Sequence, residues 1–341
     1  MKISIGMNLQ PGPWGGGNQF GHALSKYLRD RGVTVSYDLK DSDLDLILLA
    51  DPRKETRISA YTDREIFKYL LLKNWKAIVV HRINECDERK GTQGVNNFYH
   101  KANLCADHTV FVSSWLRDLH LKSGIPSKSY SVLLAGADQA IFNSDRYTKW
   151  NKRGKLKLVT HHWSTAVQKG FDIYTRLDAM IGEPQWKDKI EFNYIGKLSD
   201  SIQWKHTRYI PPQSGSELAR SIKENHVYLT ASQNEPSGMH HIEGAMCGLP
   251  ILYRQSGGIP EYCQGFGIAF KGPEDFENSL VHMFETYDIW ADRMGKYPYT
   301  AERMCQTFYD LVLDLITNRE SFLKKRSRRD YLTWYLKRIW H

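Results

Sequence analysis

The sequence predicts an α/β protein made of two Rossmann-like domains, each a parallel sheet covered by helices. Its 341 residues are too many for one ordinary domain of roughly 100–200 residues. Apolar runs of four to seven residues alternate with helical patterns in both halves, which is typical of parallel strands buried on both faces. Between the halves, residues 144–155 (SDRYTKWNKRGK) are polar and lack periodicity, so we expect the domain boundary there.

The first half begins with a strand, a glycine-rich turn and an amphipathic helix. Phe20 and Leu24 share one face of this helix, and Gly32 marks its end. Further helices are expected around residues 63–74 and 115–122. The predicted strands are 3–7 (ISIGM), 33–39 (VTVSYDL), 44–50 (LDLILLA), 76–80 (KAIVV), 108–113 (HTVFVS) and 129–134 (SYSVLL).

The second half repeats this strand–helix alternation. We expect helices at 171–180 and after SGSE, where Ser214 and Glu217 have capping-box spacing. The predicted strands are 156–162 (LKLVTHH), 190–196 (IEFNYIG), 207–211 (TRYIP), 227–232 (VYLTAS), 251–254 (ILYR) and 267–270 (GIAF). The predicted domains are residues 1–148 and 149–318, followed by a basic amphipathic helix at 319–341.

The net charge of +9 is concentrated at the C-terminal end. Residues 319–341 contain eight Lys or Arg and two acids, which leaves only +3 for residues 1–318. We expect a helix there with Leu332, Tyr335, Leu336 and Ile339 on one side, and with Tyr331, Trp334 and Trp340 near the edges. It either attaches to an anionic membrane surface or packs back on the first domain, and the two readings can coexist.

Composition also bears on location and partners. Five scattered cysteines without C-x-x-C spacing indicate a reducing compartment. The opening MKISIGMNLQ lacks signal-peptide features, and the apolar runs are shorter than a membrane span. We therefore expect a cytoplasmic protein, peripheral on the inner face of the membrane if the basic helix binds there. Charge confined to one tail argues against nucleic acid as a partner.

Two segments lie where parallel sheets bind ligands, directly after a strand. PGPWGGGNQFGHAL follows the first strand, so its backbone N–H groups can approach an anion at the helix start. A simple strand–helix turn would explain it equally well. Lys169, just before the helix at 171–180, could neutralise a diphosphate leaving group. The alternative is a solvated surface lysine.

The segment EPSGMHHIEGAMCGLP (235–250) places two carboxylates around a helix start. Glu243, inside the helix, is well placed to accept hydrogen bonds from both ribose hydroxyls of a nucleoside. Glu235 precedes the helix and faces whatever lies beyond the phosphates, while Gly238 lets the backbone approach a ligand closely. The competing interpretation is a first-turn acid and an exposed helical residue.

Four histidines form two adjacent pairs near these carboxylates: His161 with His162, and His240 with His241. Neighbouring residues on a helix point about 100° apart, which makes a poor chelate for zinc. We therefore expect no metal site, and single histidines that donate hydrogen bonds to a sugar or phosphate.

Residues 234–262, NEPSGMHHIEGAMCGLPILYRQSGGIPEY, resemble the donor-binding signature of glycosyltransferase family 4, the retaining group 1 transferases. The signature is Glu, seven residues and Glu, followed by small residues with Cys-Gly-Leu-Pro, a strand and Gly-Gly-x-Pro-Glu. WGGGNQFGHALSKYLRDRGVTVS, ADHTVFVSSWLRDLHLKSGIP with LLAGADQAIFN, and QKGFDIYTRLD extend the resemblance along nearly the whole chain. It implies a GT-B fold, with two Rossmann-like domains facing across a cleft and a C-terminal helix that can return to the first domain.

The resemblance also implies roles for the two carboxylates. Glu243 would bind the ribose hydroxyls of a nucleoside diphosphate sugar. Glu235 would contact the transferred sugar, helped by backbone groups of Gly238 and Met239.

Other implied contacts surround the diphosphate. Lys169 would bind it, as would backbone amides of Gly16 and Gly17, and His81 resembles a family histidine near the transferred sugar. The family usually has Gly-Arg-Leu before the lysine, but this sequence has THHWSTAVQKG and no arginine. His162 is the candidate substitute, so either it is protonated beside the diphosphate or another group supplies the charge.

These roles predict a retaining, metal-independent glycosyltransferase with Glu235, Lys169 and His81 as catalytic candidates. Its donor would be a nucleoside diphosphate sugar, and its acceptor a glycan or a lipid-linked molecule of the cell envelope. No cofactor is expected. The alternatives are a glycosyltransferase that modifies nucleic acid and a catalytically silent nucleotide-sugar-binding module.

Overall fold

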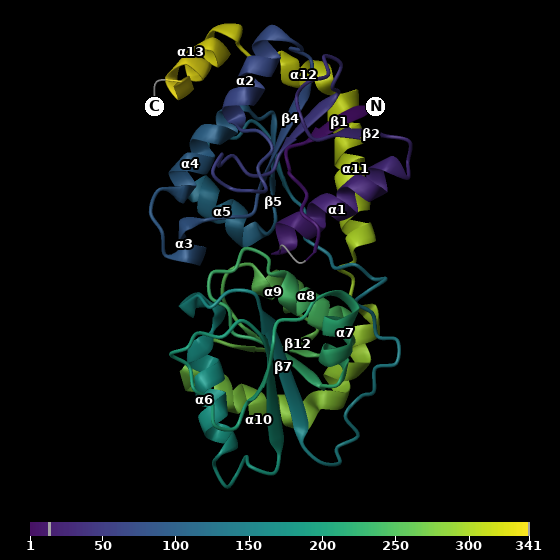
Figure 1. Cartoon of the computed structure of the whole chain (residues 1–341), viewed down its shortest axis with the longest axis vertical. Helices are drawn as coiled ribbons and strands as arrows, with labels where there is room; N and C mark the ends of the chain where they lie inside the picture. The colour runs from purple at the N-terminus through teal and green to yellow at the C-terminus, as the bar shows by residue number, and fades with distance from the viewer. Residues whose placement is uncertain (13–14, 340–341) are drawn as a thin grey trace. The chain divides into compact units, whose positions relative to one another are not determined.

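A computed structural model describes residues 1–12 and 15–339 of the chain (Figure 1). Its contacts divide the chain into two compact units. The first comprises Met1–Asp87, Gly91–Leu134 and Glu302–His341, and the second comprises Glu88–Lys90 and Ala135–Ala301.

This division differs from the expected one at residue 148. Residues 135–137 belong to the second unit because Ala137 forms backbone hydrogen bonds with the last residues of that unit. Ala137 N donates to Tyr299 O at 3.1 Å, and Ala301 N donates to Ala137 O at 2.7 Å. The polar stretch at 144–155 is a surface loop of the second unit, anchored by buried Trp150. The described part of the predicted C-terminal segment, residues 319–339, also does not stand alone, since it joins the first unit.

The first unit is built on a six-stranded, all-parallel sheet with the strand order β2-β1-β3-β4-β5-β6. Four-residue runs such as LILL in β3 are fully buried, as expected for a sheet covered on both faces. Its strands are β1 (Lys2–Ile5), β2 (Thr34–Ser36), β3 (Leu46–Leu49), β4 (Ile78–Ile83), β5 (His108–Phe111) and β6 (Tyr130–Val132). The helices between them are α1 (Gly15–Arg29), α2 (Asp63–Leu72), α4 (Val95–Ala102) and α5 (Ser114–Lys122). The short helix α3 (Asp87–Lys90) follows β4 in sequence, but its residues Glu88–Lys90 belong to the second unit.

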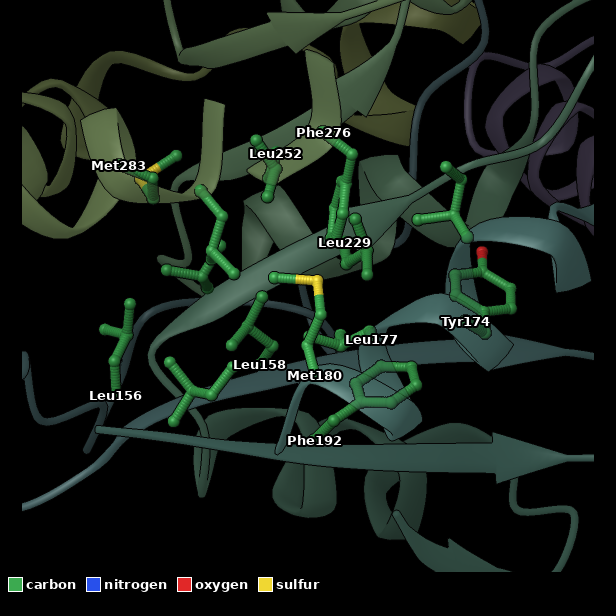
Figure 2. Packing of buried hydrophobic residues seen from close by; sticks show 14 of the residues in the cluster. Leu156, Leu158, Tyr174, Leu177, Met180, Phe192, Leu229, Leu252, Phe276 and Met283 are labelled. Carbon is green, nitrogen blue, oxygen red and sulfur yellow. The ribbon is translucent and has the colours of Figure 1, made fainter. Parts of the chain in front are cut away.

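The second unit has another six-stranded parallel sheet, ordered β12-β11-β10-β7-β8-β9. Figure 2 shows its core, where Leu158 and Phe192 of the sheet meet Leu177 and Phe276 of the covering helices. The strands are β7 (Leu156–His162), β8 (Ile190–Gly196), β9 (Arg208–Ile210), β10 (Val227–Thr230), β11 (Ile251–Arg254) and β12 (Gly267–Phe270). The helices are α6 (Phe171–Ile181), α7 (Gly215–Lys223), α8 (Met239–Met246), α9 (Ile259–Cys263) and α10 (Pro273–Arg293).

The predicted fold class, two parallel-sheet domains, is therefore confirmed. One local prediction is wrong: α7 has no capping box, because the Ser214 side chain makes no capping hydrogen bond. The Glu217 carboxylate instead accepts from Gln213 Nε2 at 3.2 Å.

The last three helices, α11 (Ala301–Thr317), α12 (Arg319–Leu323) and α13 (Arg328–Ile339), follow the second unit in sequence but return to the first. Phe308 of α11 packs edge-to-face on Phe20 of α1, with ring centroids 5.8 Å apart. Figure 1 shows α13, in yellow, beside α2. Tyr331 of α13 is fully buried against Phe67 of α2 and Trp75. The prediction that the C-terminal helix packs on the first domain is confirmed.

The buried face of α13 is not the expected one. Tyr331, Trp334 and Tyr335 pack against the core, whereas Leu332 and Leu336 are 50% and 46% exposed. The aromatic rings bury more apolar area than leucines do, and they set the rotation of the helix. Tyr335 lies on the buried side as predicted; the side chain of Ile339 and all of Trp340 lie outside the described residues. No helix among the described residues is both long and apolar enough to cross a membrane.

Candidate functional site

The candidate site of the second unit gathers where β7 and β10 end. Because carboxyl ends of parallel strands share one edge of the sheet, His162 at the end of β7 lies beside the first turn of α8. A 3₁₀ turn at Val167–Lys169 crosses the end of β10, and Gln233 N donates to Gln168 O at 2.7 Å. Gly170 allows this approach: its φ is +94°, and a Cβ there would lie 2.4 Å from that of Ala231.

Lys169 and Glu235 form the charged centre of the site. Lys169 Nζ donates to Glu235 Oε2 at 2.5 Å, and Arg89, grouped with the second unit, donates to Glu235 Oε1 at 3.1 Å. Glu235 is only 6% exposed. Burial raises the pKa of its carboxyl group, but the charges of Arg89 and Lys169 outweigh burial and hold that pKa well below its usual range. Glu235 is thus an anion with two cationic partners.

Two glycine positions pack tightly around Glu235. Gly257, with φ +65°, belongs to the SGG segment, and a Cβ there would lie 2.4 Å from Glu235 O. Gly258 N also donates to that carbonyl at 2.8 Å. Gly238, the residue before α8, has φ +74°. A Cβ at Gly238 would approach His241 Cε1 to 2.9 Å and Glu235 Cγ to 3.0 Å. The backbone at the start of α8, where Met239 is the first helical residue, therefore comes as close to Glu235 as sterics allow.

Glu243 lies one turn into α8 and is 4% exposed. Its Oε2 lies 2.8 Å from His161 Nε2. The other ring nitrogen of His161 lies 2.9 Å from the Tyr228 hydroxyl. The sequence analysis correctly placed Glu243 inside a helix. The competing interpretation, that Glu243 is an exposed helical residue, is wrong.

His162 is in the site but is not a cation. It is 3% exposed, and its Nε2 lies 2.8 Å from the Tyr174 hydroxyl. Burial, aided by the Lys169 charge, holds the pKa of His162 well below its usual value. The sequence left two replacements for the absent arginine: a protonated His162, or another group that supplies the charge. A protonated His162 does not suit this buried position next to Lys169.

The second histidine pair lies next to the first. His240 shares a hydrogen bond of 2.7 Å with Thr230, and its ring centroid lies 4.8 Å from that of His162. His241 is fully buried, edge-to-face with Tyr262 at 5.6 Å. Burial lowers the pKa of His241 to about 3 and that of His240 well below its usual value. These rings are thus neutral. Among the described residues, no group of three or more His, Cys, Asp or Glu is arranged to hold a metal.

The other predicted residues belong to the first unit. His81, in β4, is fully buried, and its Nδ1 lies 2.8 Å from Asn103 Oδ1. Burial lowers the pKa of His81 to about 4, so the ring is neutral and Nδ1 carries the proton. Gly16 and Gly17 lie in the first turn of α1. A Cβ at Gly17 would meet only Asn84 Nδ2, at 3.7 Å, so packing does not require glycine there.

Sequence reasoning missed three contributors: Arg89, Tyr228 and the contact of His161 with Glu243. Arg89 and Tyr228 are separated from their partners by 146 and 67 positions, and no local motif marks them. For His161 the only signal was its position at the end of a predicted strand.

No protein-family model matches the sequence. A 90-residue segment, 26% of the chain, is 30% identical to the D-inositol 3-phosphate glycosyltransferase of Saccharomonospora viridis and covers 19% of it. Over 69% of the chain, the sequence is 22% identical to sulfoquinovosyl transferase SQD2 of Arabidopsis thaliana and covers 41% of it. The chain therefore matches less than half the length of these curated relatives.

Solved structures agree over a longer stretch. The crystal structure of Anabaena HepE in complex with UDP superposes with a TM-score of 0.65, covering 92% of this chain and 100% of that one at 11% identity. Two six-stranded parallel sheets with this resemblance define a GT-B protein. The chain thus has a GT-B fold, and part of its sequence is similar to curated glycosyltransferases.

Proposed function

We propose that the protein is a retaining glycosyltransferase that moves a sugar from a nucleoside diphosphate sugar to a glycan or lipid-linked acceptor of the cell envelope. The observation that carries this proposal is the pair of buried carboxylates, Glu235 and Glu243. Each is held by basic or imidazole side chains at the carboxyl edge of one sheet. HepE, with the same fold, was solved with UDP and with UDP and glucose, which supports a nucleotide-sugar donor.

The Lys169–Glu235 pair suits the charge separation of glycosyl transfer. As the bond to the diphosphate breaks, the anomeric carbon becomes positive and the departing phosphate oxygen becomes negative. Glu235 is an anion and would stabilise the sugar cation, whereas Lys169 and the N–H groups at the start of α8 would stabilise the leaving group. Retention follows if the leaving phosphate accepts the proton of the acceptor hydroxyl on the same face.

Metal independence is part of this proposal. Two cationic side chains, Lys169 and Arg89, contact Glu235 and would supply the positive charge that a divalent ion otherwise brings to the diphosphate. Turnover should therefore be unchanged by EDTA. Loss of turnover that Mg²⁺ or Mn²⁺ restores would contradict this part of the proposal.

We also propose that α13 binds an anionic membrane surface, where a lipid-linked acceptor is met. Its exposed Leu332 and Leu336 lie one helical turn apart, on a helix that also exposes Arg328, Arg329 and Lys337. An apolar strip beside basic side chains suits the interface of anionic lipids. The double variant Leu332→Ser/Leu336→Ser should lose binding to phosphatidylglycerol vesicles. Leu313→Ser, which changes another exposed leucine of the first unit, should keep it.

The main test is a thermal-shift panel of nucleoside diphosphates and their sugars. At least one should raise the Tm of the wild type, and Glu243→Gln should abolish or reduce that rise. Glu224→Gln, an exposed glutamate of the same unit, is the control and should behave as wild type. Equal stabilisation of Glu243→Gln and wild type would refute the ribose role of Glu243.

Catalysis is tested separately from binding. Incubation with the stabilising nucleotide sugar should release free nucleoside diphosphate, and NMR of the product should show the anomeric configuration of the donor. Binding without any release, across a panel of acceptors, would favour the silent binding module. Tight, steeply salt-dependent DNA binding would favour modification of nucleic acid.

A further inference from the structure

An uninterrupted series of hydrogen bonds connects the backbone of β7 to Glu243. His161 N lies 3.1 Å from the Tyr228 hydroxyl oxygen, and that oxygen lies 2.9 Å from His161 Nδ1. The opposite ring nitrogen, Nε2, lies 2.8 Å from Glu243 Oε2. Tyr228 is fully buried, and the other two residues are at most 4% exposed, so water does not compete for these bonds.

The donors and acceptors in this series have a defined order. A backbone N–H can only donate, so the Tyr228 oxygen accepts from His161 N. Burial holds the pKa of Tyr228 well above its usual value, so the hydroxyl keeps its proton and can donate it to Nδ1, 2.9 Å away. A neutral ring that accepts at Nδ1 carries its own proton on Nε2, which points at Glu243. Tyr228 thereby selects the imidazole tautomer that can donate to the carboxylate.

Close packing keeps the members of the series together. A Cβ at Gly244, the residue after Glu243, would lie 2.1 Å from the ring of Tyr228. The backbone of α8 therefore rests directly on the tyrosine ring of β10, and no larger residue fits at this position. The same tyrosine that orients His161 thus sets how close α8, and with it Glu243, comes to the sheet.

We propose that His161, oriented by Tyr228, is a positioning residue that holds Glu243 in the one orientation that grips a ribose, so that the site selects ribonucleotides over 2′-deoxyribonucleotides. The inference rests on the proposed donor. An ionised carboxylate has about four acceptor positions, enough for His161 and two ribose hydroxyls together. Fixing the carboxylate before the ligand arrives removes the entropic cost of ordering it on binding.

The test measures affinities of UDP, GDP and ADP and of their 2′-deoxy counterparts by calorimetry. The wild type should bind one ribonucleotide on the order of 100-fold more tightly than its 2′-deoxy counterpart, because a buried carboxylate left without its hydroxyl partner is costly. His161→Leu should reduce that ratio by about ten-fold, the effect of losing one hydrogen bond to a charged group. His161→Gln, whose amide can still donate to Glu243, should recover most of the ratio.

Two further variants separate positioning from general damage. Tyr228→Phe removes the hydroxyl that selects the tautomer and should reduce the ratio to an intermediate value. His226→Gln changes another histidine of the same unit, at the opposite end of β10, where Lys157 N donates to its ring. It should keep the wild-type ratio.

The outcomes distinguish this inference from the function on which it rests. If no nucleoside diphosphate binds the wild type, both fail. If the wild type discriminates and Glu243→Gln does not, but His161→Leu keeps the full ratio, the positioning role is overturned and the donor site stands. If His161→Leu lowers affinity for both nucleotide series equally, its effect is structural and the inference is again overturned.

Discussion

Replacing Gly238 with alanine is the sharpest test of how the site is built. Gly238 has φ +74° and ψ 106°, a conformation that costs an L-residue roughly 1–2 kcal/mol. The new Cβ would also lie 2.9–3.0 Å from His241 Cε1, Glu235 Cγ and His240 Cε1. Overpacking of this kind costs roughly 1–3 kcal/mol, so the expected loss of stability is about 2–5 kcal/mol.

Gly265→Ala is the matched control. Gly265 also has a positive φ, +87°, and belongs to the same unit, but nothing lies within 4 Å of an added Cβ. It should show only the backbone cost. Since about 1 kcal/mol shifts the Tm of a unit of this size by roughly 2–4 °C, Gly238→Ala should lower the Tm by about 10 °C and the control by about 3 °C.

Calorimetry with and without the stabilising nucleotide distinguishes two effects. The clash at Gly238 displaces Glu235 and the start of α8, so the nucleotide-induced rise in Tm should also shrink in Gly238→Ala but not in Gly265→Ala. If the two alanine variants lose equal stability and show equal nucleotide-induced rises in Tm, the close packing around Glu235 does not contribute to stability or to nucleotide binding, and the reasoning fails.

Three other perturbations have defined outcomes. Lys169→Met should slow sugar transfer by about 100-fold or more, the usual effect of removing one stabiliser of a developing anion, in an assay of nucleotide release where Lys149→Met stays near wild type. Arg326→Met leaves fully buried Asp107 without its guanidinium partner and should lower the free energy of unfolding by about 3–5 kcal/mol. Its control, Arg319→Met, breaks the part-exposed ion pair with Asp45 and should change the Tm by less than about 3 °C. The folded pKa of Glu235 lies below its usual 4.5, so its ion pairs stabilise the fold above pH 4.5 and are lost as the pH falls further; Glu235→Gln should flatten the decline of Tm in that acidic range.

The sequence was sufficient to predict the sheets because each buried strand is a continuous apolar run. LILL of β3 and GIAF of β12 could be located by composition alone, since strands covered on both faces exclude polar residues. The same reasoning failed for α13, where both sides of the helix carry apolar residues. Which side is buried depends on Phe67 and Trp75, residues more than 250 positions earlier in the chain that a local pattern does not contain.

The candidate site shows the same limit. Glu235 and Glu243 could be selected because they sit in one contiguous motif, and Lys169 because of its place before a helix. Their partners could not, because ion pairs and hydrogen bonds between distant segments form only once the sheet order is known. The order β10-β7 brings His161 to Tyr228, and nothing in the spacing of the sequence predicts that order.

The buried histidines give a physical account of the missing arginine. His162, His240 and His241 are all kept neutral by burial, so they contribute hydrogen-bonding edges and no charge. Positive charge comes instead from Lys169 and Arg89, two cations on the single carboxylate of Glu235, which leaves this trio with a net positive charge. A protonated histidine next to Lys169 would add repulsion inside a low-dielectric site, whereas a neutral one does not. In the proposed donor site the two tasks are therefore separated. Lys169 and Arg89, which contact Glu235, would supply the charge for a diphosphate, whereas His161 orients Glu243.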